Sequence, residues 1–264
     1  MPDFVTSDGA TINYRVEGRE DGPPLLLSNS LATNLSLWDG QVGEANYRGF
    51  RLIRYDQRGH GASSAPEGDY TIERLADDVL ELLDHLAIEQ ASFCGISLGG
   101  MTGIQLAKHH SRRFTRVAVC NATVWMPAKD TWNDRIAAVK AGGMAAAADP
   151  TIGRWFDEVF RQSHPDEVAL VRDMILATNP VGFAGCAAAV RDMDLRDQLG
   201  LIDCPVMVVT GSHDQSVTPE QSQYIVQRIP GAQKMVLQAG HLSNVEQRDA
   251  FNQAVFDFLS GERL

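Results

Sequence analysis

Short runs of hydrophobic residues recur along the chain, each about as long as a buried strand. Longer segments with helical periodicity lie between most of them. The clearest is Thr71–Leu86, whose hydrophobic positions fall on one face of a helix and whose Thr71 is suited to cap the first turn. This alternation predicts a mostly parallel sheet with helices on both faces. The expected strands are Pro24–Leu27, Arg51–Tyr55, Ala91–Cys94, Val117–Cys120, Pro205–Thr210 and Lys234–Leu237.

The N-terminal segment has a different pattern. Two short alternating runs, Phe4–Thr6 and Ile12–Val16, flank the dipeptide Asp8-Gly9. An Asp-Gly pair between alternating runs is typical of a β-hairpin turn. We therefore expect the chain to begin with two antiparallel strands.

The alternation of strands and helices stops between about Asn121 and Asp203, where only helical patterns are found. We expect an α/β fold whose core comprises residues 1–121 and 203–264, with residues 122–202 inserted as a helical cap. A cap in this place lies near the carboxyl ends of the strands, where α/β proteins bind ligands. The cap holds three of the four tryptophans, and its expected helices are Thr131–Ala141, Ile152–Arg161, Pro165–Thr178 and Val181–Asp192.

The strongest chemical signal is the stretch Cys94-Gly95-Ile96-Ser97-Leu98-Gly99-Gly100, which contains G-x-S-x-G. A predicted strand precedes it and a helical pattern, Met101–His109, follows it. In this context the serine sits on a strained turn with its hydroxyl exposed at the end of the sheet, and the flanking glycines let neighbouring backbone approach closely. The alternative is a glycine-rich turn with an incidental serine. We favour Ser97 as a nucleophile.

A nucleophilic serine needs a base, and the base needs an orienting acid. Three histidines follow Ser97 beyond the adjacent helix: His164, His213 and His241. We favour His241, because it follows the last predicted strand and precedes the last helix, where a loop can reach the serine. Asp214 follows the preceding strand by a few residues and is the expected acid. A plain turn aspartate and a helix-capping histidine are the alternatives.

The composition excludes some classes of partner. The 264 residues carry a formal net charge of −11 and no lysine/arginine run, whereas nucleic-acid binding needs a basic surface. No run of about 18 apolar residues suggests a membrane span, and no signal peptide is evident. The four cysteines are far apart and suit buried positions in a reduced compartment. We expect a cytoplasmic protein without nucleic-acid or membrane partners.

The order Ser97, Asp214, His241 with a helical insertion after the serine resembles the α/β-hydrolase superfamily. Dehalogenases and epoxide hydrolases of that fold carry an aspartate as nucleophile, which Ser97 disfavours. Within the superfamily the chain is similar to the 3-oxoadipate enol-lactonases of the β-ketoadipate pathway of aromatic catabolism. The segments that carry this resemblance are LLLSNSLATNLSLWD, YDQRGHGASSAPEGDYTIERLADDVLELLDHLAI, FCGISLGGM, WNDRIAAVKAGGM, AGCAAAVRDMDLR and AGHLSNVEQ.

The resemblance implies hydrolysis of a small anionic lactone through an acyl-enzyme, with no metal or organic cofactor. It implies backbone N–H groups of Leu98 and Leu31 as the oxyanion hole. Asn29-Ser30 stands where relatives carry His-Gly. Because Ser30 and Ala32 replace glycines, we expect ordinary backbone angles at both.

The substrate carboxylate needs a cation within a negative protein. Trp132 and Arg135 share a face of the first cap helix, where the arginine could bind the carboxylate and the indole could line the apolar part. A solvated arginine beside a core tryptophan is the alternative, and Arg191 is a second candidate. Arg58 and His60, in the loop Asp56–Gly61, suit a role in bracing the end of the sheet.

Two other functional classes remain open. A broader carboxylesterase, a perhydrolase or a hydrolase of carbon–carbon bonds in ring-cleavage products would use the same three residues. A non-catalytic ligand-binding protein is the other class, although such α/β-hydrolase relatives often lack a member of the triad, and all three are present here.

Overall fold

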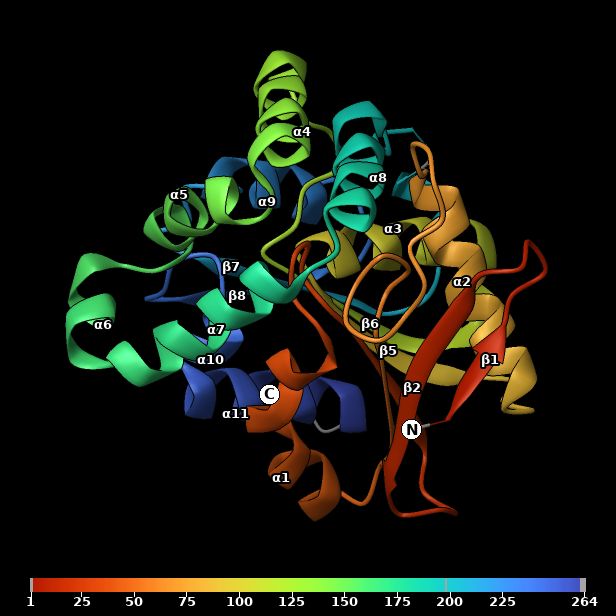
Figure 1. The fold of residues 1–264 in the computed structure, drawn as a ribbon. Helices are drawn as coiled ribbons and strands as arrows, with labels where there is room; N and C mark the ends of the chain where they lie inside the picture. The colour runs from red at the N-terminus through yellow and green to blue at the C-terminus, as the bar shows by residue number, and fades with distance from the viewer. Residues whose placement is uncertain (1, 198, 262–264) are drawn as a thin grey trace.

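An eight-stranded sheet forms the centre of the computed structural model, which describes residues 2–197 and 199–261 (Figure 1). The strand order is β1-β2-β4-β3-β5-β6-β7-β8. The pairs from β4 to β8 are parallel, and β1 and β2 form the antiparallel hairpin expected around Asp8-Gly9. The strands are β1 (Asp3–Val5), β2 (Thr11–Gly18), β3 (Pro24–Ser28), β4 (Arg51–Tyr55), β5 (Ala91–Ile96), β6 (Phe114–Cys120), β7 (Val206–Gly211) and β8 (Gln233–Leu237).

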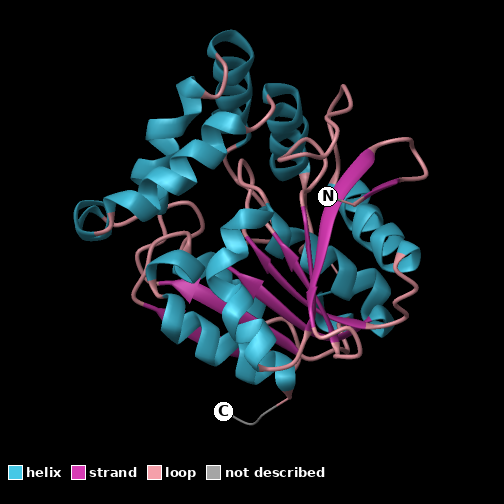
Figure 2. Cartoon of the chain, turned by 60° about the horizontal axis from the view of Figure 1, so that its bottom comes forward, coloured by secondary structure: helices cyan, strands magenta, loops and turns pink. Residues whose placement is uncertain are grey.

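Helices cover both faces of the sheet (Figure 2). Two of them, α2 and α3, pack against each other, and α1 and α11 form a second packed pair. The side chain of Thr71 accepts a hydrogen bond from the Arg74 amide and caps α2, as its sequence predicts. The α/β fold with a mostly parallel sheet is confirmed. The helices of the core are α1 (Asp39–Tyr47), α2 (Ile72–His85), α3 (Leu98–His110), α9 (Pro219–Val226), α10 (Ser243–Glu246) and α11 (Arg248–Ser260).

Between β6 and β7 the described residues form five α-helices and no strand of the sheet. We call residues 122–202 the cap; it stands over one end of the sheet in Figure 1. Residue 198, and residues 1 and 262–264 of the expected core, lie outside the described residues. The cap helices are α4 (Lys129–Gly142), α5 (Ala145–Trp155), α6 (Glu158–Ser163), α7 (Pro165–Ala177) and α8 (Pro180–Asp192).

The expected cap helix Ile152–Arg161 is wrong, because the chain breaks in its middle. Phe156 and Asp157 have extended backbone angles that end α5 and begin α6. The alanine-rich stretch 142–150, which lies between two expected helices, supplies most of α5. Alanine is the strongest helix former. Gly143, which has a positive φ of 68°, ends α4 and separates it from α5.

The cap is fastened to the core by close backbone contacts. Gly182 of α8 lies against Gly59 of the loop after β4, and a Cβ at Gly182 would stand 2.1 Å from the Gly59 carbonyl oxygen. Nearby, the Tyr70 amide of the core donates to the Gly185 carbonyl of α8. The cap is therefore held in place by main-chain groups as well as by apolar packing.

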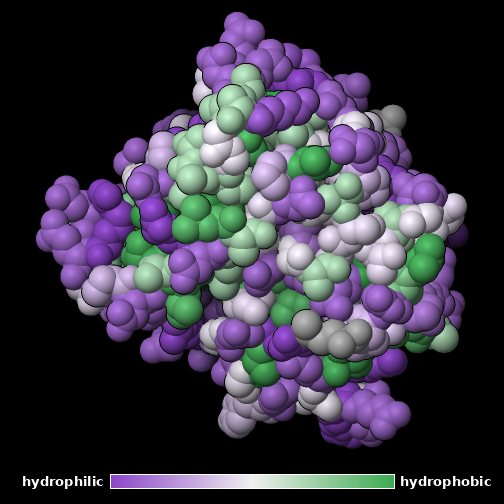
Figure 3. Space-filling model, in the orientation of Figure 1, coloured by the Kyte–Doolittle hydropathy of each residue, from purple (hydrophilic) through white to green (hydrophobic). Residues whose placement is uncertain are grey.

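The outer surface of the cap is mixed in character. In Figure 3 the tip around α4 and the region of α6 are mainly hydrophilic, while hydrophobic residues gather below α4 and beside α5. Among the described residues, no single helix is long and apolar enough to cross a membrane. By length and composition alone, the bent pair of α7 and α8 passes that test together, with an angle of 98° between them.

The glycine contact between cap and core gives a stability prediction. Gly182→Ala should lower the free energy of unfolding by about 1–3 kcal/mol, because the new methyl group meets backbone that cannot rotate away. Gly153→Ala is the matched control in α5, where a Cβ meets no atom within 4 Å. It should be neutral or stabilising by up to about 1 kcal/mol. Urea unfolding of both variants measures the contrast, and equal midpoints would contradict the proposed tight contact.

Candidate active site

Ser97 lies on a sharp turn between β5 and α3. Its backbone angles, φ 55° and ψ −115°, are rare for a residue with a side chain. Hydrogen bonds on each side hold this turn: the Ser97 amide donates to the Cys120 carbonyl, and the Gly99 amide donates to the Asn29 carbonyl. A Cβ at Gly95 would stand 2.2 Å from the Gly99 carbonyl oxygen. The turn thus requires the glycines of the motif.

Three side chains from distant parts of the sequence meet at this end of the sheet. Ser97 Oγ lies 2.9 Å from His241 Nε2, and His241 Nδ1 lies 2.8 Å from Asp214 Oδ2. All three residues are buried, with Asp214 at 4% and His241 at 2% of their full exposure. Such a chain of hydrogen bonds can move the serine proton to the imidazole and stabilise the resulting imidazolium.

The two other histidines considered are placed elsewhere. His164 is exposed, and its ring contacts Phe160 and the Ser163 hydroxyl. His213 Nδ1 lies 2.6 Å from Asp157 Oδ2 at the junction of α5 and α6. Neither contacts Ser97 among the recorded hydrogen bonds.

Asp214 is held by four hydrogen bonds. Its Oδ1 accepts from the amides of Ser216 and Val217, and its Oδ2 accepts from His241 and from Asn121 Nδ2. Asn121 follows β6 directly and has a positive φ of 48°. Its Oδ1 accepts from the Ser243 hydroxyl. Sequence reasoning missed Asn121, although an asparagine at the carboxyl end of a central strand, beside the strand that carries the acid, was an available signal.

Two backbone amides are available beside the serine. Leu31 lines the same cavity as Ser97, and Leu98 is the first residue of α3. Within residues 2–197 and 199–261, neither amide donates a recorded hydrogen bond to another protein group. An N–H at the start of a helix has no acceptor within the helix and favours negative charge. Both amides are therefore free to receive an oxyanion.

The backbone next to Leu31 corrects one expectation. Ser30 has no positive φ, as predicted. Ala32 has a φ of 61°, so the prediction of ordinary backbone angles at this residue is wrong. The Ala32 amide donates to His60 Nε2 at 2.9 Å, and the Thr33 amide donates to the Ser30 carbonyl. These contacts fix a tight turn, so the surroundings impose the strained angle on an alanine.

The loop after β4 supports this turn from below. Arg58 forms a buried ion pair with Asp78 and a second pair with Asp8. His60 Nδ1 lies 3.1 Å from the Arg58 carbonyl oxygen, which fixes Nδ1 as the donor and leaves Nε2 to accept from Ala32. Burial lowers the pKa of His60 to about 4, so the ring is neutral and keeps this acceptor at neutral pH. Arg58 and His60 brace the sheet end, as expected.

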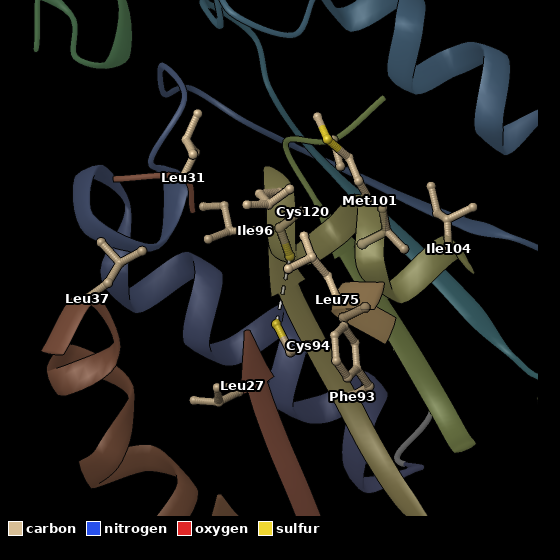
Figure 4. Close-up of a cluster of buried hydrophobic side chains, with 14 of the residues drawn as sticks. Leu27, Leu31, Leu37, Leu75, Phe93, Cys94, Ile96, Met101, Ile104 and Cys120 are labelled. Atoms are coloured by element: carbon tan, nitrogen blue, oxygen red, sulfur yellow. Dashed lines mark hydrogen bonds between the residues drawn. The ribbon is translucent and has the colours of Figure 1, made fainter. Parts of the chain in front are cut away.

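A cavity of about 350 Å³ opens above the serine and extends beneath the cap. Figure 4 shows Leu31, Ile96 and Met101 gathered at the ends of the strands, with Leu27 and Phe93 deeper along them. All four cysteines are buried and free, and Cys94 and Cys120 lie below the serine turn with their sulfurs 3.9 Å apart. The cavity is lined by Leu31, Ala32, Ser97, Met101, Met126, Thr131, Trp132, Asp134, Arg135, Ala138, Ala146, Ala147, Pro150, Thr151, Arg154, Trp155, Phe183, Val190, Gln215, Ser216, Val217 and His241.

The cap residues predicted from the sequence divide into two groups. Trp132 and Arg135 line the cavity, and the Arg135 guanidinium lies 4.6 Å from the centre of the Trp132 ring. Arg191 is absent from the cavity wall, and its guanidinium binds Asp69, Asp192 and Asn133. The structure therefore does not bring Arg191 to the site. A residue that the sequence reasoning missed, Arg154 of α5, lines the cavity instead.

The cap also contacts the histidine directly. The His241 amide donates to the Trp155 carbonyl, and the two rings lie 5.6 Å apart. A Cβ on the adjacent Gly240 would stand 2.5 Å from the same carbonyl oxygen. Glu246 Oε1 accepts from the Gly240 amide, and burial raises the pKa of this carboxyl to about 7. The end of α5 is thus part of the wall that fixes the histidine loop.

No group of three or more His, Cys, Asp or Glu side chains among the described residues could hold a metal ion. The expectation that no cofactor takes part stays a prediction.

The fold and the Ser–His–Asp geometry define a serine hydrolase site of the α/β-hydrolase type. The family model for the alpha/beta hydrolase fold matches residues 23–247, and the chain belongs to this family. It is 41% identical to 3-oxoadipate enol-lactonase 2 of Acinetobacter baylyi, over 96% of this chain and 94% of that protein.

Solved structures of an enol-lactonase and an esterase are similar to this chain over nearly its full length. The enol-lactonase from Burkholderia xenovorans LB400 is 41% identical, with a TM-score of 0.95, covering 98% of this chain and all of that chain. A thermophilic esterase from Thermogutta terrifontis, with malate bound, is 28% identical, with a TM-score of 0.92 and 98% of each chain covered.

The strained turn at Ala32 gives a second prediction. Ala32→Gly should change the free energy of unfolding by less than about 1 kcal/mol, because relief of the positive φ offsets the added freedom of the unfolded chain. Ala32→Val should destabilise by more than about 1 kcal/mol, since a β-branched residue is poorly tolerated there. Urea unfolding separates them, and equal stabilities of the two variants would contradict the assigned turn.

Glu246 gives a pH-dependent prediction. Because its pKa is raised to about 7, Glu246 keeps its proton in the folded protein at pH values where it has lost it in the unfolded chain. The contribution of Glu246 to the free energy of unfolding therefore falls as the pH rises from about 4.5 to about 7. The charge of Asp157 adds to the raised pKa of Glu246, whereas hydrogen bonds from the Gly240 and Asp157 backbone and the charge of His213 oppose it. Glu246→Gln should therefore raise the urea midpoint relative to wild type at about pH 8, and this gain should vanish below about pH 5.

The control is Glu89→Gln, which removes the same charge from an exposed loop. It should show a smaller pH-dependent gain. If both variants respond equally, net charge and not the environment of Glu246 is responsible.

Proposed function

We propose that this protein opens the ring of 3-oxoadipate enol-lactone and releases 3-oxoadipate. The observation that carries the proposal is the hydrogen-bonded chain from Ser97 through His241 to Asp214, whose serine and histidine line a cavity beneath the cap. The full-length similarity to enol-lactonases supports this substrate over others. The ligand is thus a small lactone that carries a carboxylate.

In the first half of the reaction, Ser97 Oγ attacks the lactone carbonyl carbon while His241 Nε2 takes the hydroxyl proton. Asp214 keeps the proton on Nδ1 and stabilises the imidazolium. The carbonyl oxygen becomes an oxyanion between the amides of Leu31 and Leu98, which together lower the barrier to its formation. Each role matches a contact or a free donor in the structure.

In the second half, the ring C–O bond breaks and the ring oxygen leaves as an enolate, which takes the proton held by His241 and becomes the ketone, so that His241 is neutral again. The organic chain stays attached to Ser97 as an ester. Water then attacks this ester with His241 as base, and His241 returns the proton to Ser97 Oγ. The product has one more carboxylate than the lactone, and the enzyme is unchanged.

The cap supplies the rest of the pocket in this proposal. Trp132 offers an apolar wall, and Arg135, stacked on its ring, faces the anionic part of the substrate. Because the protein as a whole is strongly acidic, the substrate depends on such a local cation to enter.

A broader carboxylesterase is the second candidate. The supporting observation is the apolar side of the cavity, formed by Met126, Phe183 and Val190, which suits uncharged acyl chains. The similarity to the Thermogutta esterase points the same way. A ligand-binding role without turnover is disfavoured, because the Ser97–His241 hydrogen bond is already formed.

The test is Ser97→Ala. It should reduce kcat for the enol-lactone by at least about 10⁴-fold, since removing a triad member leaves only binding and oxyanion stabilisation. Loss of the conjugated absorbance of the lactone measures turnover, and circular dichroism checks the fold. Near-normal turnover by this variant would end the proposal.

The matched control is Ser163→Ala. Ser163 also has a histidine neighbour, His164, but the pair is exposed on the cap. This variant should keep full activity and full labelling by a fluorophosphonate, whereas Ser97→Ala should lose both. Parallel assays with a short p-nitrophenyl ester and a ring-cleavage dienoate rank the alternative substrates.

A further inference from the structure

Two arginines of the cap line the cavity without a carboxylate partner. Arg135 lies on α4 and Arg154 on α5, and neither takes part in any ion pair recorded within residues 2–197 and 199–261. Arg154 donates one hydrogen bond, to the Thr151 hydroxyl, while its Nε is buried and has no acceptor. Asp134 lies on the cavity wall too, but its side chain is exposed and pairs with neither arginine.

Three of the other four cap arginines have carboxylate partners; Arg161 of α6 has no ion pair within residues 2–197 and 199–261, but it does not line the cavity. Arg172 pairs with Asp149, Arg191 with Asp69 and Asp192, and Arg196 with Asp194. In a chain with more acidic than basic residues, carboxylate partners are plentiful. Arg135 and Arg154 are therefore distinguished by lacking such a partner on the wall of one cavity.

This arrangement is electrostatically unfavourable when the cavity is empty. Burial, and to a smaller extent the charge of Arg154, lowers the pKa of Arg135 to about 10. Burial also lowers the pKa of Arg154. A bound anion would reverse both effects, because it would supply the missing acceptors and screen the repulsion between the two cations.

We propose that Arg154 and Arg135 together form a carboxylate-binding site in the cap, and that this site makes the enzyme selective for esters and lactones that carry a free carboxylate. Open-chain half-esters of dicarboxylic acids are then substrates as well as the lactone. This inference rests on the proposed hydrolase function of Ser97, but it does not require that the ester be cyclic.

In this proposal the two arginines contribute different N–H donors to the bound carboxylate. Arg135 is held flat on Trp132, which leaves the edge of its guanidinium for the ligand. Arg154 brings an unsatisfied Nε, so a carboxylate can accept from two sides at once. The apolar wall between these groups and Ser97 suits the methylene chain of a dicarboxylate.

The chemistry of half-ester hydrolysis balances with water alone. Ser97 Oγ bonds to the ester carbonyl carbon, the ester C–O bond breaks, and His241 gives the alcohol its proton. Water then cleaves the acyl-enzyme, so one half-ester and one water yield one dicarboxylic acid and one alcohol. The distal carboxylate remains bound to the arginines and does not react.

The experiment compares monoethyl esters of succinic, glutaric and adipic acid with counterparts in which a primary carboxamide replaces the carboxylate. The carboxamide keeps the shape and removes the charge. Ethanol release gives kcat and KM at about pH 8 for wild type, Arg154→Met, Arg154→Lys and Arg172→Gln. The last is the matched control, since Arg172 is an exposed cap arginine outside the cavity.

We expect wild type to prefer the best half-ester over its carboxamide by about tenfold or more in kcat/KM. Arg154→Met should lower kcat/KM for the half-ester by about tenfold or more, mainly through KM, and change the carboxamide by less than about threefold. Arg154→Lys should retain part of the preference as a point charge. Arg172→Gln should match wild type.

Two results would overturn the inference. One is an equal loss with both substrates in Arg154→Met, which marks a packing role. The other is a wild-type enzyme that opens the enol-lactone but hydrolyses none of the half-esters. A wild-type enzyme that prefers the half-esters but does not open the enol-lactone would instead overturn the proposed function and leave the carboxylate site standing.

Discussion

The strained turn at Ser97 is the constraint on which the rest of the site depends. Its positive φ survives only because β3 and β6 hold it from both sides, through the Asn29 and Cys120 carbonyls. Such close approach needs glycine at Gly95 and Gly99, where any side chain would enter neighbouring backbone. The sheet therefore acts as a rigid frame that sets the nucleophile, the free amides of Leu31 and Leu98, and the mouth of the cavity relative to one another.

The ends of the parallel strands also position the residues around His241. Asp214 and His241 follow two adjacent strands, β7 and β8, and Asn121 follows the strand before them. Parallel strands bring their carboxyl ends to one edge, so residues that are far apart in sequence meet there. Asn121 then ties the acid to the Gly240 carbonyl, which stands next to the histidine. Apart from His241, the groups that bind the Asp214 carboxyl are amides, so its position does not depend on another titratable side chain.

Much of this was predictable from the sequence, for a definite reason. The hydrophobic runs of the strands and the G-x-S-x-G turn are visible within a few neighbouring residues. The order of Ser97, Asp214 and His241 along the chain can be read directly from the sequence. What sequence reasoning missed depends on contacts between distant segments. The angle at Ala32 is imposed by His60, the break between α5 and α6 overrides a continuous helical pattern, and Arg154 stands out only because no acidic side chain reaches it.

The hydrogen bond from the His241 amide to the Trp155 carbonyl joins the cap wall of the cavity to the loop that carries His241. The cap is consequently not a module that can be exchanged freely among relatives. A transplanted cap must reproduce the end of α5, or it displaces the base along with the pocket. We expect a change in cap length or helix register that shifts the end of α5 to move the His241 loop as well as the cavity wall.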